Sequence, residues 1–401
     1  MLKFYWEHCI AFSGALRLKI KEVMNKYNKL FAPLLFGNGI NLKNRIVMSP
    51  MTTWASNEDF TISDEEVEYY KKRVKGVGLV ITGCTHVTAN GIGFTHEFAG
   101  YDDTFLPSLK KLADAAKSGG APAILQMFHA GNKAIPGLIP DGEVVSASTV
   151  SSGPIVLFEN ENFSKKLSEN EILEIIKAFG ETAKRAIEAG FDGVEIHGAH
   201  GFLLQNFISP FFNNRNDQWG GSLENRLRLS LEILREVKNI VSKYADRPFL
   251  IGYRISPEEF PQQTYGLPDT FVLMDKLIEE KIDYLHFSLL DAVNQQPIDS
   301  EFSKEPISVV LNNYVNSRVP VLVAGGITTP AMADQVVDYG VSMVAIGRTL
   351  IVNPDWVELT QNGEEDKITS ILKLATVQEK KIPSKLMAIF EKIEGWVQVE
   401  A

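Results

Sequence analysis

Eight short apolar segments, spread along most of the chain, constrain the fold more than any other feature of the sequence. Most are rich in Val, Ile and Leu and almost free of charge, as strands buried on both faces of a parallel sheet are. They therefore predict eight parallel strands. The segments are Arg45–Ser49, Gly78–Thr82, Ala121–Met127, Gly193–His197, Phe249–Arg254, Tyr284–Ser288, Val319–Ala324 and Ser342–Gly347.

Helical patterns separate these segments. In 168–189 and 223–244 the apolar residues recur with the 3.6-residue period of an amphipathic helix, and Ser168 and Ser222 are suitable N-caps. Eight alternations of strand and helix predict an α/β fold, the (β/α)8 TIM barrel. A doubly wound open sheet is the alternative, but no glycine-rich dinucleotide fingerprint follows the first strand, and the alternation continues to the eighth.

The expected barrel spans residues 24–362, with one insertion and two flanking segments. Residues 129–166, after the third strand, contain Gly, Pro, Ser and Asn and are too long for a simple loop, which predicts a lid. Residues 363–401 have amphipathic spacing and are expected to form a helical tail, packed on the barrel or on a second copy of the chain. Residues 1–23 are expected to lie outside the core.

Composition limits the functional classes. A formal net charge of −10, from 50 acidic and 40 basic residues, argues against non-specific nucleic-acid binding. Two cysteines, Cys9 and Cys84, are too few for a disulfide scaffold, a four-cysteine zinc site or an iron–sulfur cluster, and a reducing cytoplasm is the simplest location. No apolar run approaches the ~20 residues that span a bilayer, so no membrane association is expected.

Glycines after the last two strands predict an anion site. The working groups of a TIM barrel project from the C-terminal ends of its strands. Gly325 and Gly326 follow the seventh strand, and Gly347 and Arg348 follow the eighth. Backbone N–H groups at such glycines can approach a phosphate, and the guanidinium can pair with its oxygens. The alternative is that these glycines form only tight turns.

Two polar side chains end other strands. Arg254 follows an uncharged run, so its charge must be compensated. It could lie beneath a flavin ring and stabilise negative charge there. Gln126 suits the uracil-like edge of the same ring, because an amide both donates and accepts. A structural ion pair and a backbone-bonded amide remain the alternatives.

His197 and His200 at the end of the fourth strand admit three interpretations. As two fixed donors, they would hold a carbonyl or nitro oxygen while negative charge develops on it. As metal ligands, they would need a third partner such as His129, but no acidic cluster joins them and no metal site is predicted. As core histidines, they would have only a structural role. Their position at a strand end favours the donors.

Three motifs carry a family resemblance: LKNRIVMSPMT at 42–52, HGAHG at 197–201 and NRNDQWGGSLENR at 214–226. In this order and spacing they resemble the old yellow enzyme family of NADH:flavin oxidoreductases, and the similarity runs from about Tyr27 to Asp355. The resemblance implies a bound FMN, NAD(P)H as hydride donor, and hydride transfer through flavin N5. The substrate it implies is a small activated alkene, an α,β-unsaturated carbonyl or nitro compound.

The resemblance also implies a role for each candidate residue. His197 and His200 would bind the activating oxygen of the substrate, with Trp54 and Phe202 nearby. FMN would be held by Ser49, Pro50, Met51, Thr52, Cys84, Gln126, Arg254, Gly325, Gly326, Gly347 and Arg348.

One departure from the family pattern leaves the acceptor open. Phe202 stands where most relatives have a tyrosine that donates a proton to the substrate, and phenylalanine has no exchangeable proton. Water, Tyr69 or Tyr70 could supply it instead. The alternative function is an FMN-dependent NAD(P)H:acceptor reductase, for quinones or nitro compounds, with little ene-reductase activity. A non-catalytic FMN-binding module and a metal-dependent barrel lyase are more distant alternatives.

Overall fold

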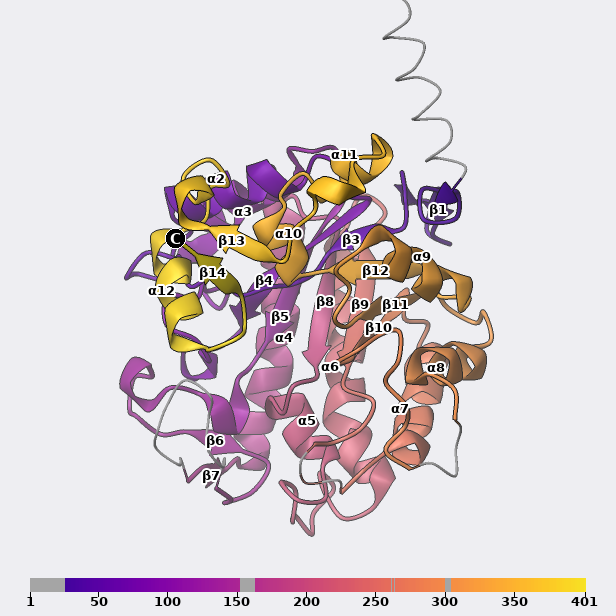
Figure 1. Cartoon of the computed structure of the whole chain (residues 1–401). Coiled ribbons are helices and arrows are strands. Elements are labelled where there is room, and N and C mark those ends of the chain that lie inside the picture. Colours follow the sequence, from indigo (N-terminus) through magenta and orange to yellow (C-terminus); the bar gives the residue numbers. More distant parts are fainter. Residues whose placement is uncertain (1–25, 152–162, 261, 263, 300–303) are drawn as a thin grey trace, which may run out of the picture.

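The computed structural model describes residues 26–151, 163–260, 262, 264–299 and 304–401. Eight parallel strands close into a barrel, which confirms the predicted TIM barrel (Figure 1). The last strand pairs with the first, through Val344↔Ile46 and its neighbours. The barrel strands are β3 (Ile46–Met48), β4 (Leu79–His86), β5 (Ala123–Phe128), β8 (Gly193–Gly198), β9 (Leu250–Ile255), β10 (Tyr284–Ser288), β11 (Val321–Ala324) and β12 (Met343–Ile346).

Helices surround the barrel. Ser168 caps the first long helix of the expected pair through a capping box with Glu171, and Ser222 caps the second by accepting from Asn225 N–H. The helices are α2 (Asp64–Arg73), α3 (Leu106–Lys117), α4 (Glu169–Ala189), α5 (Leu203–Ile208), α6 (Leu223–Tyr244), α7 (Leu267–Glu279), α8 (Ile307–Val315), α9 (Pro330–Asp338), α10 (Arg348–Val352), α11 (Trp356–Gln361) and α12 (Ser384–Lys392).

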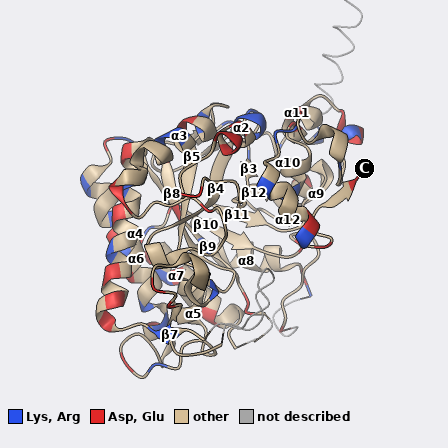
Figure 2. Ribbon diagram, turned by 90° about the vertical axis from the view of Figure 1, so that its left-hand side faces the viewer, with Lys and Arg blue, Asp and Glu red and all other residues tan. Residues whose placement is uncertain are grey.

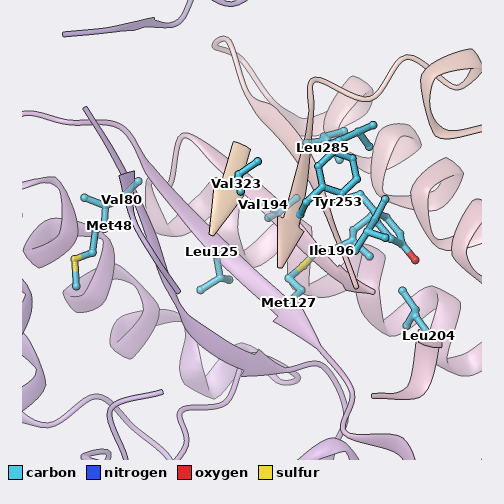
Figure 3. Close-up of a cluster of buried hydrophobic side chains, with 14 of the residues drawn as sticks. Met48, Val80, Leu125, Met127, Val194, Ile196, Leu204, Tyr253, Leu285 and Val323 are labelled. Atoms are coloured by element: carbon cyan, nitrogen blue, oxygen red, sulfur yellow. The ribbon is translucent and has the colours of Figure 1, made fainter. Parts of the chain in front are cut away.

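Alternate residues of most barrel strands belong to two separate cores. On β3, Ile46 and Met48 pack outward against the helices, whereas Val47 packs inside the barrel. Figure 3 shows the outward set, including Val80, Leu125 and others from successive strands. This two-residue alternation is the geometry of a strand buried on both faces, and it explains the nearly continuous apolar runs in the sequence.

The N-terminal hairpin extends the inner core. Strands β1 (Leu34–Leu35) and β2 (Asn41–Leu42) are antiparallel. Phe36 and Leu42 are buried with the barrel-interior residues, and the Phe36 ring meets Tyr284 edge-on at 6.3 Å between centroids. This apolar packing fills the barrel at the level where its strands begin.

The segment after the third strand contains little regular structure where it is described. It includes short 3-10 turns at Gly131–Lys133 and Pro136–Leu138 and a two-stranded pair, β6 (Val145–Ser146) with β7 (Lys165–Lys166). The expected N-terminal extension, 1–23, and the middle of the expected lid, 152–162, lie outside the described residues.

The C-terminal tail differs from the expected helical segment. Its α-helix is α12, whereas β13 (Ile371–Lys373) and β14 (Gln398–Glu400) pair in parallel. β-branched residues around Thr369 and Ile371 favour extended backbone, and Pro383 disfavours helix in the residue before it. The amphipathic spacing therefore predicts α12 correctly but not the rest of the tail.

Charged residues lie on the outer helices. Figure 2 shows acidic and basic residues interspersed along the surfaces of α4 and α6. Within the described part of the chain, no helix is long and apolar enough to cross a membrane.

Candidate active site

The barrel interior changes from apolar to polar toward the C-terminal ends of its strands. On β5, the in-barrel position after Ile124 is Gln126, which is paired in register with Glu195 on β8. Arg254 on β9 is paired in register with His286 on β10. All four side chains are buried. The sheet therefore places four polar groups at one level, directly above the apolar plug.

Glu195 is the centre of this polar layer. Its two oxygens accept from Gln126 Nε2 at 2.7 Å and from His286 Nδ1 at 2.9 Å. Burial alone would raise the pKa of the Glu195 carboxyl, but His286, Arg254 and Gln126 together lower it below its usual value. Burial lowers the pKa of His286, so the imidazole is neutral. The Glu195 carboxylate is thus the negative charge that compensates Arg254.

Arg254 connects this layer to the histidine pair. Its Nη2 donates to Ser288 Oγ at 2.9 Å, and Ser288 Oγ lies 2.7 Å from His200 Nε2. Arg254 Nε is buried and has no hydrogen-bond partner among the described residues. A buried donor of this kind calls for an acceptor, which a ligand can supply.

Both histidines are neutral donors. Ala199 N–H donates to His197 Nδ1 at 3.2 Å, which places the imidazole proton on Nε2. Because Ser288 Oγ accepts from Arg254, its own proton can go to His200 Nε2, which leaves the His200 proton on Nδ1. Burial lowers the pKa of His197 well below its usual value.

His200 faces open space, yet it stays neutral too. Its position deep in the barrel mouth, with the positive charges of Arg254 and Lys133 nearby, holds its pKa well below the usual value. The imidazole centroids of His197 and His200 are 4.9 Å apart. Two neutral N–H groups at this spacing can hold one oxygen that gains negative charge.

Two adjoining cavities open at this end of the barrel. The first, about 580 Å³, is lined by Ser49, Met51, His200, Arg254, Gly325, Gly326, Gly347 and Arg348, together with residues of the C-terminal tail. The second, about 640 Å³, is lined by Lys133, Gln205, Glu258 and Glu259 among others. His200, Ser288, Leu289 and Leu290 line both, so the two cavities meet beside the histidine pair.

The first cavity fits FMN. Its volume is that of a cofactor pocket. A Cβ on Gly325 would lie 2.9 Å from the backbone of Ala292 and Leu289, and Gly326 has a φ of 59° that disfavours other residues. Arg348 supplies a cation beside these glycines, and the free Arg254 Nε supplies a donor for the ring. The donor set thus matches a phosphate at one end and an electron-rich ring at the other.

A β-bulge places Cys84 beside the polar layer. The register of β4 against β5 shifts between Ile81 and Cys84, so that Cys84, not Gly83, is opposite Gln126. Cys84 Sγ lies 3.4 Å from Thr52 Oγ1. Burial raises the pKa of the thiol to about 12, so the group stays protonated.

Several predicted residues lie behind the cavity walls. Phe202 packs edge-on against His197 and His200, at 5.1 and 6.2 Å between centroids. Trp54 is buried and contacts the tail residue Trp396. Tyr69 and Tyr70 are buried and line neither cavity, and the Tyr70 hydroxyl accepts from Gly83 N–H. Pro50 and Thr52 belong to the loop that follows β3.

Sequence reasoning missed four residues of the site. Glu195 and His286 are polar residues within otherwise apolar strands, at positions that point into the barrel. This pattern could have identified both residues from the sequence. Ser288 ends its strand and could have been found in the same way. Trp396 could not, because its place depends on how the tail docks. His129 is buried and accepts from Gly131 N–H, and no group of three or more His, Cys, Asp or Glu among the described residues could hold a metal ion.

Comparison with known proteins identifies the family. The NADH:flavin oxidoreductase / NADH oxidase family model matches residues 29–367. The chain belongs to this family. The match confirms the resemblance to old yellow enzymes and shows an NAD(P)H-dependent flavin oxidoreductase that binds FMN.

Three similar proteins represent this family. A Bacillus subtilis (strain 168) protein named "Probable NADH-dependent flavin oxidoreductase YqiG" is 40% identical over 93% of this chain and 98% of its own length. A Klebsiella pneumoniae (strain 342) NADH:fumarate oxidoreductase is 36% identical over 85% of the chain, which spans only 37% of that relative. Morphinone reductase in complex with tetrahydroNAD superimposes with a TM-score of 0.71 and 27% identity, covering 84% of this chain and 91% of that one.

Proposed function

We propose that this flavin oxidoreductase reduces the C=C bond of α,β-unsaturated carbonyl or nitro compounds at the expense of NAD(P)H. The observation that carries the proposal is the neutral imidazole of His200, which lines both cavities, with that of His197 at 4.9 Å between ring centroids. FMN, when bound, accepts a hydride from NAD(P)H and delivers one to the acceptor. The chain's own residues then have to orient the acceptor and handle its charge and proton.

The histidine pair would orient the acceptor through its activating oxygen. His197 Nε2–H and His200 Nδ1–H would both donate to this oxygen as it gains negative charge. When Ser288 Oγ accepts from Arg254 and donates to His200 Nε2, the proton of His200 lies on Nδ1, on the side away from Ser288. Because both imidazoles are neutral, they stabilise the charge without transferring a proton to the oxygen.

Other residues would hold the cofactor. Gly325, Gly326, Gly347 and Arg348 would bind the phosphate, because they line one end of the first cavity. Arg254, with its free Nε, and Gln126 would face the ring. Ser49, Pro50, Met51, Thr52 and Cys84 would lie along its edge.

A specific observation favours a second candidate, an NAD(P)H:acceptor reductase for quinones or nitro compounds. The described residues that line the two cavities include no tyrosine, and Phe202 stands beside the histidine pair. Reduction of an alkene needs a proton at the α-carbon, and no tyrosine hydroxyl on the described cavity walls can supply it. A quinone needs no such proton on carbon.

Anaerobic kinetics would separate the two candidates. The protein, reduced by NADH or NADPH, should be reoxidised by cyclohexenone if the first proposal holds. Reoxidation by a quinone but not by cyclohexenone or nitrocyclohexene would favour the second. A protein whose bound FMN is bleached by neither nucleotide would contradict both.

A further inference from the structure

The C-terminal tail crosses one end of the proposed FMN cavity. We define the C-terminal clasp as residues 371–401, which comprise β13, α12 and β14. Figure 1 shows this segment, in yellow, lying over the barrel beside α10. Four of its residues, Gly395, Trp396, Val397 and Gln398, line the same cavity as Gly326, Gly347 and Arg348. The clasp thus forms a wall of the cavity at its phosphate end.

Arg348 joins the clasp to the phosphate site. Its Nη1 donates to the carbonyl oxygen of Trp396 at 3.2 Å. The same guanidinium is the cation expected to pair with the cofactor phosphate. A guanidinium has five N–H donors in a planar fork, so it can bind a phosphate and a backbone carbonyl together.

The turn that presents Trp396 depends on Gly395. This glycine has a φ of 74°, which side-chain-bearing residues rarely adopt, although a Cβ there would meet open space. The Trp396 ring then packs between Trp54 and Phe390, at 5.6 and 5.5 Å between centroids, and Val397 is buried. The aromatic contacts fix the direction of the chain as it enters β14.

The rest of the clasp is docked independently of the cavity. Ser384 N and Oγ each lie 3.1 Å from Glu65 Oε2, and Lys385 Nζ donates to the Ser56 carbonyl at 3.0 Å. Leu386 of α12 is fully buried. These contacts hold α12 in place, so a change at residues 395–398 should alter the cavity wall without releasing the tail.

We infer that the C-terminal clasp retains FMN, by closing over the phosphate end of the cavity and sharing Arg348 with the cofactor. The inference rests on the proposed FMN site. Cofactor and clasp should stabilise each other, because each gives the Arg348 side chain a partner that orders it for the other. Loss of the clasp geometry should weaken binding of FMN more than binding of riboflavin, which lacks the phosphate.

Two substitutions in the full chain test this inference. Gly395→Val strains the turn, and Trp396→Ala removes the ring that docks it. Gly120→Val is the matched control, because Gly120 also has a positive φ of 80°, meets open space and lies away from the cavity. We expect each clasp variant to bind FMN at least about tenfold more weakly, measured by quenching of flavin fluorescence on the apoprotein, with unchanged riboflavin affinity and circular dichroism.

A second readout is proteolysis of the tail. FMN should slow cleavage within residues 393–401 of the natural protein and of Gly120→Val, and should have little effect on Gly395→Val. Equal FMN affinity in the clasp variants and the natural protein would overturn the inference while leaving the FMN site in place. Failure of the natural protein to bind FMN would instead overturn the proposed site itself, and the inference with it.

Discussion

The ring of Phe202 meets the imidazole of His197 edge-on, with centroids 5.1 Å apart and planes inclined at 79°. The phenyl group is buried with Cys84, Phe128 and other apolar residues, so it packs only carbon against the imidazole of His197. Phenylalanine has no exchangeable proton, so Phe202 cannot protonate the α-carbon of an alkene substrate.

Phe202→Tyr should therefore raise the rate at which cyclohexenone reoxidises the reduced protein. General acid catalysis contributes about 10²–10⁴-fold where geometry is good, and a newly introduced hydroxyl should give about tenfold or more. Quinone reoxidation should stay the same. Stopped-flow flavin absorbance under anaerobic conditions measures both. Phe202→Leu, which changes the packing without adding a hydroxyl, is the control; equal rates for the Phe202→Tyr variant and the natural protein would mean that the proton is not limiting.

Removal of either imidazole should slow enone reduction. His197→Ala and His200→Ala each delete one donor to the developing charge, which costs about 10²–10³-fold in comparable sites. In each variant, the rate at which NADH reduces the protein serves as an internal control. This rate should fall less than the rate of enone reduction. His200→Asn retains an N–H donor and should recover part of the loss. If alanine at both positions left enone turnover intact, the histidine pair would not be the oxygen-binding site.

Much of the fold was readable from the sequence, for a physical reason. Parallel strands buried on both faces leave uncharged runs, and a run such as Tyr284–Ser288 matches its strand, β10, end to end. The helix at Leu223–Tyr244 was equally clear, since its period and its N-cap agree. β4 was harder: a bulge carries it on to His86, and its glycine and threonines weakened the pattern.

The site was readable only in part. His197, Arg254 and Gln126 could be singled out as candidates because they stand near the C-terminal ends of apolar strands. Their hydrogen-bond partners could not be predicted. Ser288 bonds to Arg254, 34 residues away in the sequence, and to His200, 88 residues away. Trp396 meets Trp54 across most of the chain, and no local pattern encodes such a contact. The tail, expected to be helical, is helical at Ser384–Lys392 but forms strands at Ile371–Lys373 and Gln398–Glu400, because amphipathic spacing does not show where a helix must stop.

Arg254 and Glu195 are buried opposite charges that interact through space, and the free energy of unfolding should be more sensitive to loss of one charge than of both. Arg254→Met leaves the Glu195 carboxylate without its cation and should cost about 3–5 kcal/mol in the free energy of unfolding of the apoprotein. The double variant Arg254→Met with Glu195→Gln should recover part of this loss in the free energy of unfolding. Urea denaturation followed by circular dichroism measures both. Additive losses would show that the two charges do not interact.

His129 should make the protein less stable in acid. Burial lowers the pKa of this imidazole from 6.5 to about 3, so the folded protein keeps it neutral while the unfolded chain takes up a proton below pH 6.5. The contribution of neutral His129 to the free energy of unfolding is therefore complete above pH 6.5. It falls by about 1.4 kcal/mol per pH unit between pH 6.5 and about 3. Urea denaturation from about pH 8 to about pH 5 should give equal slopes above pH 6.5 and, below it, a slope that becomes shallower by up to about one proton in His129→Gln, in which the amide oxygen can still accept from Gly131 N–H. An unchanged slope would contradict this assignment.

His200 has a φ of 62°, in the left-handed region of the backbone. Among residues other than glycine, asparagine, aspartate and histidine are the ones that most readily adopt this conformation. Aspartate would bring a negative charge toward an oxygen that is itself becoming negative, and glycine carries no donor. The main chain therefore favours glycine, asparagine, aspartate or histidine at this position, and the need to donate to a substrate oxygen leaves histidine and asparagine. A mutational search for new acceptors has to vary the surrounding walls.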